Sequence, residues 1–418
     1  MTRTEIIQAA FETWGAVGYQ ATSLSALADT LGVTKTALYH HFKNKDDILG
    51  AMYDTFFDSM GDKLRPLFEK TIACIEDGAS KADVFESILL VNNEITEFFV
   101  KNPWYFMFSL IKVHGNTDCR LNSSIQLRER GLDFEKMRQI EVYLGDKDRY
   151  PLLFQLVFAC SLCIIAHFLE VLWTEGRLET GVCEITDKVN GFIRHGMGFR
   201  REKIDSLDWE ALEKAAEWRE TEGGGGGRRR RLIKVVASVV AAADPWAASM
   251  AMVAKKSGLS KSGLYAHFAS KRDMLRQLFL EEFDGVIRYA QAVSKKSGVP
   301  EEQLYMAIRA VEGFLTSEPE FLAAIGSLKT RRINFDMDRI EDMHRDNGEC
   351  LNKFSQVFSE IKDAEGEPLI DETTVGVILF LLTDTLIGKP DAMEYKAIPD
   401  ESLRILYRFI ALGMEGAK

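Results

Sequence analysis

The sequence is poor in cysteine and proline, and its first residues are not those expected of a secretion signal. Six cysteines in 418 residues, with no cysteine and histidine cluster at metal-ligand spacing, indicate reduced thiols in a cytoplasmic protein. The close pair Cys160 and Cys163 lies in an apolar run, which favours core packing over redox chemistry. Nine prolines and 26 phenylalanines favour a helical chain. The N-terminus MTRTEIIQ has no apolar h-region, so we expect no signal peptide.

Catalytic and membrane-spanning signatures are also absent. We find no GxSxG, Walker A, HExxH or deaminase motif and no GxGxxG after a strand, so we expect no enzyme, no metal and no cofactor. The longest apolar stretch, Leu152 to Trp173, approaches the length of a membrane span but contains Gln155, His167 and Glu170. It therefore predicts a buried bundle or interface helix, and no membrane partner.

The chain contains one segment twice. LGVTKTALYHHFKNKDDIL at residues 31–49 recurs as SGLSKSGLYAHFASKRDML at 257–275, with nine of nineteen positions identical at an offset of 226. Gly196 and Gly413 continue the correspondence near the end of each copy, at an offset of 217. Between the copies, Asp208–Glu222 has the composition of an amphipathic helix, and the five glycines at 223–227 predict a flexible tether.

Each copy has the residue spacing of a helix-turn-helix. An alanine, a glycine four residues later and a leucine six residues beyond it recur around Gly32 and Gly258; a small contact residue and a glycine turn let two helices cross closely. The expected N-caps of the second helix and of the next one are Thr34 and Asn44 in copy 1, and Ser260 and Ser270 in copy 2. The exposed turn of the second helix suits base contacts in a major groove. The candidates there are Thr34, Lys35, Thr36, Tyr39 and His40 in copy 1, and Ser260, Lys261, Ser262 and Tyr265 in copy 2.

A second set of side chains is expected to bind phosphate. Its members are Thr22, Ser23 and Lys45 in copy 1, and Ser249, Lys271 and the run Arg228, Arg229, Arg230 and Arg231 in copy 2. Lys45 and Lys271 open a helix, where a cation opposes the helix dipole, so they indicate a role outside stability. The arginine run resembles an arm for phosphates or a minor groove. The alternative interpretation of both features is solvated surface charge.

The motif GYxxTSLxxLAxxLGVTKTALYxHFxNKDxIL resembles the DNA-binding domain of TetR-family transcriptional regulators, and copy 2 resembles it too. The resemblance implies an all-α fold, in which each copy has three DNA-binding helices and a divergent helical domain that binds a small molecule and dimerises through its last two helices. The predicted segments are a DNA-binding domain at 1–49, a ligand-binding and dimerisation domain at 50–205, a helical and polyglycine linker at 206–227, a second DNA-binding domain at 228–275 and a second ligand-binding domain at 276–418. The chain departs from the family because it holds two copies.

Charge separates the two DNA-binding segments from the rest. The whole chain carries a net charge of -11, residues 1–49 carry -1 and residues 228–275 carry +8, which leaves -18 on the other 321 residues. The acidity therefore lies away from the predicted DNA-reading segments, and the average charge does not argue against a nucleic-acid partner.

These features predict a ligand-responsive repressor that reads double-stranded DNA. The copies are expected to pair through Leu152–Arg200 and Asp371–Gly413 as an internal pseudo-dimer, monomeric in solution, that reads an imperfect palindromic operator. One alternative is a helical small-molecule-binding or protein-interaction module in which one or both DNA-reading segments are degenerate. Another is association of two chains, which gives four DNA-reading segments.

The effector is an unknown small molecule. Asn92 lies on the helical face shared by Ile88, Ile95 and Phe99, where a polar residue is either a ligand contact or a satisfied core amide. The complete set of candidate ligand contacts is Asn92, Trp104, Phe108, His114 and His167. Core packing is the alternative for each of them.

Overall fold

The computed structural model describes residues 1–17, 23–109, 123–132, 149–174, 181–217, 227–243, 248–329, 340–363, 365–387 and 397–417. Within these ranges the regular structure is helical, apart from an isolated bridge between Lys362 and Pro368. The predicted all-α class is confirmed. The chain divides into two compact units: unit 1 comprises Met1–Phe154, Ile164–Asn190 and Thr330–Glu341, and unit 2 comprises Gln155–Cys163, Gly191–Lys329 and Asp342–Lys418.

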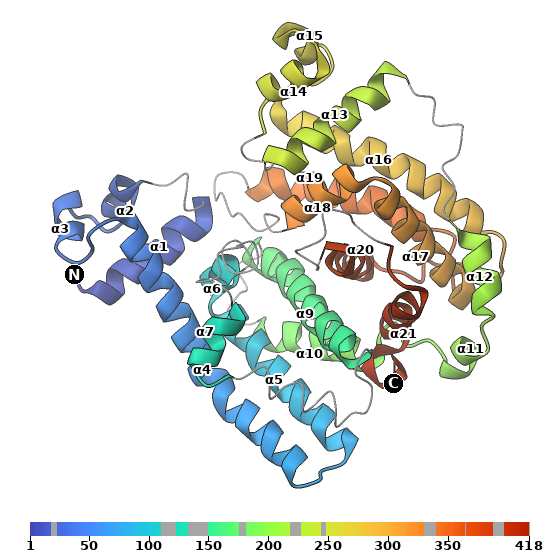
Figure 1. Ribbon diagram of the computed structural model, residues 1–418, viewed down its shortest axis with the longest axis horizontal. Helices are drawn as coiled ribbons and strands as arrows, with labels where there is room; N and C mark the ends of the chain where they lie inside the picture. The colour runs from blue at the N-terminus through green and yellow to red at the C-terminus, as the bar shows by residue number, and fades with distance from the viewer. Residues whose placement is uncertain are drawn as a thin grey trace. The chain divides into compact units, whose positions relative to one another are not determined.

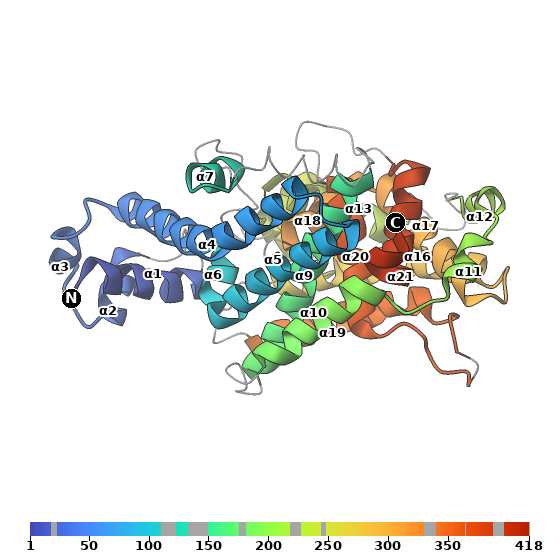
Figure 2. The same ribbon diagram turned by 90° about the horizontal axis from the view of Figure 1, so that it is seen from below.

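Unit 1 begins with three helices, α1 (Arg3–Val17), α2 (Leu24–Thr30) and α3 (Lys35–Tyr39), followed by the long helix α4 (Lys45–Glu76). The chain reverses at Gly78, whose φ is 74°, and enters α5 (Lys81–Lys101) through a capping box between Ser80 and Asp83. Helices α4 and α5 run side by side and antiparallel (Figures 1 and 2). The short helices α6 (Pro103–Phe108) and α7 (Ser123–Glu129) follow.

Aromatic side chains join α1 to the helices behind it. The Phe11 ring lies 4.5 Å from Tyr105 and 5.1 Å from Phe108 on α6, between centroids. Phe108 also lies 4.9 Å from Tyr53 and 5.7 Å from Phe56 on α4. Such pairs contribute about 0.5–1.5 kcal/mol each beyond the area that they bury. The first three helices of unit 1 are therefore packed on α4 and α6 by a hydrophobic contact.

The long apolar stretch forms helix α9 (Arg149–Thr174), as predicted, and α10 (Val182–His195) follows it. The segment Leu152–Leu169 is long and apolar enough to cross a membrane, and 61% of it is buried inside the fold, as in a core helix. Cys160 and Cys163 are buried, and burial raises the pKa of the Cys160 thiol. Both thiols therefore pack as core residues.

Unit 2 repeats the plan of unit 1. Its helices are α13 (Arg228–Ala243), α14 (Met250–Ser257), α15 (Lys261–Tyr265), α16 (Lys271–Ser294), α17 (Pro300–Ser317), α18 (Pro319–Lys329), α19 (Ile340–Ser355), α20 (Glu372–Ile387) and α21 (Asp400–Ala417), with a 3-10 turn at Gln356–Phe358. Here α13 is tied to the α17–α18 junction by charge: Lys234 donates to Glu318 at 2.9 Å, and Arg230 lies 3.6 Å from the same carboxylate. In unit 2, ion pairs between α13 and Glu318 thus stand where unit 1 has the aromatic contact between α1 and α6.

The helices α11 (Arg201–Asp205) and α12 (Trp209–Ala216) connect the two copies and pack on copy 2. The Trp209 ring lies edge-on to Tyr305 at 5.1 Å. Glu213 accepts two hydrogen bonds from the Arg404 guanidinium, at 2.9 and 3.0 Å, and one from the Tyr305 hydroxyl at 2.9 Å. The linker segment is therefore docked along its helical part.

The predicted linker helix is shorter than expected. It was expected over Asp208–Glu222, but it ends at Ala216 because Glu217 leaves the helical region, with φ -54° and ψ 121°. The Tyr289 hydroxyl donates to the Glu217 carbonyl oxygen and holds this exit on α16. Residues 218–226, with most of the predicted tether, lie outside the described residues.

Inside unit 2, the backbone just after α10 lies in close contact with the backbone of α21. Gly196, with φ 55°, and its counterpart Gly413, with φ 68°, are packed against each other's neighbours. A Cβ atom at Gly196 would lie 2.4 Å from the Ile410 carbonyl oxygen, and one at Gly413 would lie 2.3 Å from the Arg194 carbonyl oxygen. The Met197 N–H donates to the Ile410 carbonyl at 2.9 Å. Equivalent residues of the two copies thus touch, as in an isologous interface.

Candidate nucleic-acid interface

The helix-turn-helix of copy 1 forms as its sequence predicts. Ser23 caps α2 by accepting the Ala26 N–H at 3.1 Å, and Thr34 caps α3 by accepting the Ala37 N–H at 3.3 Å. Gly32 takes a φ of 63° between the helices, a left-handed conformation that favours glycine. The following Val33 N–H donates back to the Ala28 carbonyl at 2.9 Å, which closes the turn.

Copy 2 repeats this geometry in detail. Ser249 caps α14 and Ser260 caps α15, with hydrogen bonds of 3.3 and 3.0 Å. Gly258 has a φ of 70°, and the Leu259 N–H donates to the Ala254 carbonyl at 3.0 Å. The predicted caps of the next helix, Asn44 and Ser270, are confirmed too: they accept the N–H groups of Asp47 at 2.8 Å and Asp273 at 3.0 Å. We call residues 1–49 head 1 and residues 228–275 head 2.

The predicted base-reading side chains are exposed along α3 and α15 and at their caps. Tyr39 is 49% exposed and Tyr265 is 47% exposed, whereas Leu38 and Leu264 on the opposite side are buried. The other exposed candidates are Thr34, Lys35, Thr36 and His40 in head 1, and Ser260, Lys261 and Ser262 in head 2. The Ser262 hydroxyl lies 3.1 Å from that of Ser260, so it is oriented by the cap. Each head therefore presents a large aromatic side chain and a lysine on a short, fixed helix.

One arginine in each head fixes the loop that follows the reading helix. The sequence analysis missed Arg3, and it placed Arg229 among the phosphate contacts. In head 1, Arg3 donates to the His41 carbonyl at 3.1 Å, and its guanidinium lies 4.2 Å above the Phe42 ring. In head 2, Arg229 donates to the His267 carbonyl at 3.2 Å and lies 4.7 Å above the corresponding phenylalanine ring. The recurrence of arginine at an offset of 226 was the available signal. Cation–π and hydrogen-bond contacts together fix the loop after the helix.

The phosphate candidates lie near the reading helices. Ser23 and Ser249 are the caps described above, and Thr22 lies outside the described residues. Lys45 and Lys271 are half-buried first residues of α4 and α16, and burial lowers the pKa of both. The Lys45 ammonium lies 5.6 Å from the centroid of the Trp14 ring.

The four arginines of head 2 form the first turn of α13 instead of an extended arm. Arg228 and Arg231 are exposed. Arg229 pairs with Glu281, its Nε 2.8 Å from Oε1, and Arg230 lies 3.6 Å from Glu318. Two of the four therefore point outward, and two hold head 2 on the helices behind it.

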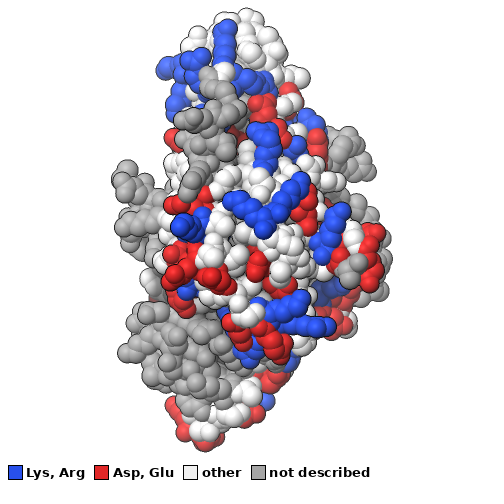
Figure 3. Space-filling model, turned by 90° about the vertical axis from the view of Figure 1, so that its right-hand side faces the viewer, with Lys and Arg blue, Asp and Glu red and all other residues white. Residues whose placement is uncertain are grey.

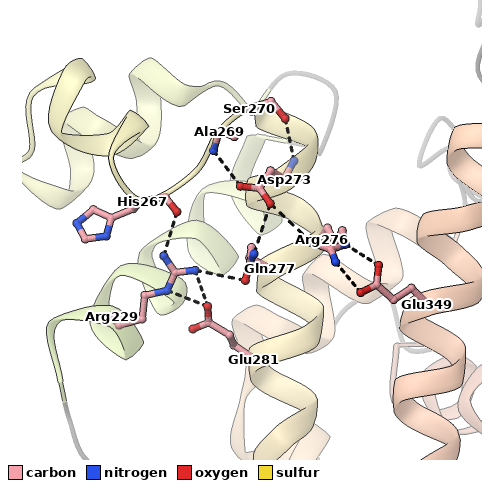
Figure 4. Close-up of polar contacts among 9 residues, drawn as sticks. All are labelled: Arg229, His267, Ala269, Ser270, Asp273, Arg276, Gln277, Glu281 and Glu349. Atoms are coloured by element: carbon pink, nitrogen blue, oxygen red, sulfur yellow. Dashed lines mark hydrogen bonds and ion pairs between the residues drawn. The ribbon is translucent and has the colours of Figure 1, made fainter.

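A polar network runs from the end of α15 to α19 (Figure 4). The Asp273 carboxylate accepts the Ala269 N–H at 2.9 Å and the Gln277 side chain at 3.4 Å, and lies 3.8 Å from Arg276. Arg276 then forms a bidentate pair with Glu349 on α19, at 2.7 and 2.6 Å. The pair with Arg276 lowers the pKa of Glu349. Charged side chains therefore connect head 2 to α19 without a break.

The candidate ligand contacts are dispersed over three helices. Asn92 is buried on α5, Trp104 is half-buried on α6, and Phe108 belongs to the aromatic contact with Phe11. The His167 ring on α9 lies 5.3 Å from Phe168. His114 lies outside the described residues. Within the described ranges, no group of three His, Cys, Asp or Glu side chains is placed to hold a metal ion.

A match to a known family agrees with this geometry. Residues 6–52 and 236–278 each match the tetR family of bacterial regulatory proteins. The crystal structure of the TetR family transcriptional regulator PfmR from Thermus thermophilus is similar to this chain at 18% sequence identity and a TM-score of 0.31, over 44% of this chain and 96% of that one. Both family matches coincide with the heads. The chain therefore carries two tandem copies of the helix-turn-helix domain of the tetR family of bacterial regulatory proteins.

Proposed function

We propose that this regulator acts as a single-chain repressor, with its two heads reading the two halves of an imperfect palindromic operator. The observation that carries the proposal is the repetition of one reading geometry, with the same caps, turn and exposed tyrosine and lysine, at both heads. The heads differ at two reading positions, where Ala37 and His40 of head 1 correspond to Gly263 and Ala266 of head 2. Because the recognition helices are similar but not identical, we expect the two half-sites to be similar but not identical in sequence.

Pairing of the copies within one chain is the second part of the proposal. It is supported by the contact of Gly196 with Gly413 and by the hydrogen bond from Gln155 on α9 to Asp384 on α20, at 3.0 Å. These residues come from the helices that each copy would use for pairing. A two-fold arrangement places recognition helices about one DNA turn, roughly 34–36 Å, apart. A chain that pairs internally carries both half-site readers in a single molecule.

Contacts with DNA are assigned by exposure. Lys35, Tyr39, Lys261 and Tyr265 are proposed to contact base edges, with the neighbouring hydroxyls in support. Ser23, Ser249, Lys45 and Lys271 are proposed to position the phosphate backbone, together with Arg228 and Arg231. Arg229 and Arg230 leave this set because they bind carboxylates within unit 2.

Selection of bound sequences from random duplex DNA tests the proposal. The wild-type chain is compared with Lys35→Ala plus Tyr39→Ala, and with Lys261→Ala plus Tyr265→Ala. We expect an imperfect palindrome, in which each double variant blurs a different half-site by about 1–3 kcal/mol of discrimination. A palindrome that neither variant changes would contradict the assignment, and no enrichment at all would support a ligand-binding or protein-interaction module with degenerate heads. The net charge of -1 on head 1 is the feature that favours this second function.

Ligand response and repression complete the proposal. A small molecule bound in either helical body would change operator affinity by favouring one arrangement of the heads. Asn92, Trp104, Phe108, His114 and His167 remain the candidate contacts for such a molecule. A reporter placed behind the selected operator should rise when the protein is removed; a reporter that falls would show activation instead.

A further inference from the structure

We propose that head 2 is the anchoring head, which holds the chain on duplex DNA of any sequence, whereas head 1 contributes selectivity and little charge. This inference rests on the proposed DNA-reading function and assigns unequal roles to its two heads. It is carried by two independent features of the described residues: the exposed charge on each head, and the side chains that fix each recognition helix from behind.

Exposed cations are concentrated on head 2. Those without an ion pair among the described residues are Arg228, Arg231, Lys255, Lys256 and Lys261. The corresponding residues of head 1 are Thr2, Glu5, Asp29, Thr30 and Lys35. The charge is reversed at two of these positions and lost at two more. Figure 3 shows lysine and arginine side chains gathered at the upper end of unit 2, around α13 and α14, with acidic side chains below them.

Such charge acts on DNA without regard to sequence. Each lysine or arginine that neutralises a phosphate releases condensed counterions, so log K falls with log salt by about 0.9 per phosphate contact. Most non-specific affinity has this origin. Head 2 therefore supplies most of the salt-dependent affinity of the chain, and the five cations of its exposed face are its source.

Head 2 is also tied to its body by polar side chains that have no counterpart in head 1. The side chains that tie its recognition helix to the body are Arg276, Gln277 and Glu281, which contact Asp273, Arg229 and Glu349 (Figure 4). At the corresponding positions, α4 has Gly50, Ala51 and Thr55, and none of these can carry an ion pair. A recognition helix that is already ordered loses less conformational entropy on binding.

Together these features give an order of events on DNA. The basic, preorganised head 2 binds duplex DNA first, with a steep dependence on salt. Head 1, which has few free cations and is joined to its body by aromatic packing around Phe11 and Phe108, engages when its half-site is present. Its contribution is then mainly selectivity, because base contacts distinguish sequences and phosphate contacts do not.

Binding of the full chain to two duplexes, one of random sequence and one carrying the selected operator, tests this division across a range of salt. The variant Arg231→Glu plus Lys255→Asp gives head 2 the residues of head 1. A matched control, Lys214→Glu plus Lys362→Asp, makes the same change in net charge at exposed positions outside both heads. The reciprocal variant Glu5→Arg plus Asp29→Lys gives head 1 the residues of head 2.

We expect the head 2 variant to bind random-sequence duplex about tenfold or more weakly, with a salt slope reduced by about 1.8, the value for two lost phosphate contacts. The control should stay near wild type, and the reciprocal variant should bind random duplex more tightly. The anchoring role would be overturned if the head 2 variant bound random-sequence duplex as tightly as the wild type, or if the control weakened this binding equally. Absence of wild-type binding to both duplexes at low salt would overturn the DNA-reading function itself.

Discussion

At the scale of single residues, the two copies differ in one buried position, where Glu282 of α16 corresponds to Phe56 of α4. Phe56 is part of the aromatic contact behind head 1, whereas Glu282 is buried close to Glu318. Burial, and then repulsion by Glu318, raise the pKa of Glu282 to about 7, although Arg230 and Lys234 oppose the shift. Copy 2 thus carries a carboxyl group that destabilises the fold when it ionises.

The pH dependence of stability follows from this pKa. Glu282 binds a proton more tightly in the native state than in the unfolded chain, where its pKa is the ordinary 4.5. The stabilisation that comes from this tighter binding is therefore full at low pH, and it is lost as the pH rises through the native pKa of about 7. Glu282→Gln should therefore raise the free energy of unfolding at pH 8 by up to about 3 kcal/mol, and change it little at pH 5. Urea unfolding at both pH values measures this, with the exposed Glu320→Gln as control. An equal effect of Glu282→Gln at both pH values would contradict it.

At the scale of elements, the heads depend on short helices whose geometry is set by caps and by one glycine each. Helices α3 and α15 have five residues each, too few to be stable alone. They persist because Thr34 and Ser260 cap them, and because Arg3 and Arg229 hold the loops that follow.

Two glycine substitutions of opposite sign in copy 2 test this view. Gly258 has a φ of 70° and Gly285 lies inside α16, and neither would bring an added Cβ within 4 Å of another atom. Gly258→Ala should cost about 1–2 kcal/mol, because the left-handed conformation disfavours a side chain. Gly285→Ala should stabilise by about 0.5–1 kcal/mol, because alanine is the better helix former. Chemical denaturation measures both, and a neutral Gly258→Ala would show that the turn relaxes freely.

At the scale of the whole molecule, close approach of Gly196 and Gly413 is expected to hold the C-terminal parts of the two copies together. Gly196→Ala places a Cβ 2.4 Å from the Ile410 carbonyl, whereas Gly198, with a similar φ of 73°, has open space. Gly196→Ala should cost about 3 kcal/mol or more, and Gly198→Ala about 1 kcal/mol. Differential scanning calorimetry of the pair separates crowding from backbone strain. Equal losses would mean that the close contact adds nothing.

Molar mass in solution tests internal pairing directly. A chain whose copies pair with each other should have the mass of one chain, 47.2 kDa, by light scattering at micromolar concentration. The pairing proposed above would use α9, which is 61% buried over Leu152–Leu169, and the close approach of Gly413 on α21 to Arg194 on α10. Twice that mass would mean that two chains associate and that each assembly carries four heads.

Sequence alone determined the repeat, because the two segments can be compared directly. It also determined the all-α class, the caps and the glycine turns of both heads, because these depend on residues close together in the chain. Residues far apart in the chain decided the rest. The linker helix stopped at Ala216 because Tyr289 holds the next residue, and Arg229 and Arg230 turned inward because Glu281 and Glu318 lie beside them. A side chain's partners depend on which helices pack together, and local pattern does not encode that packing.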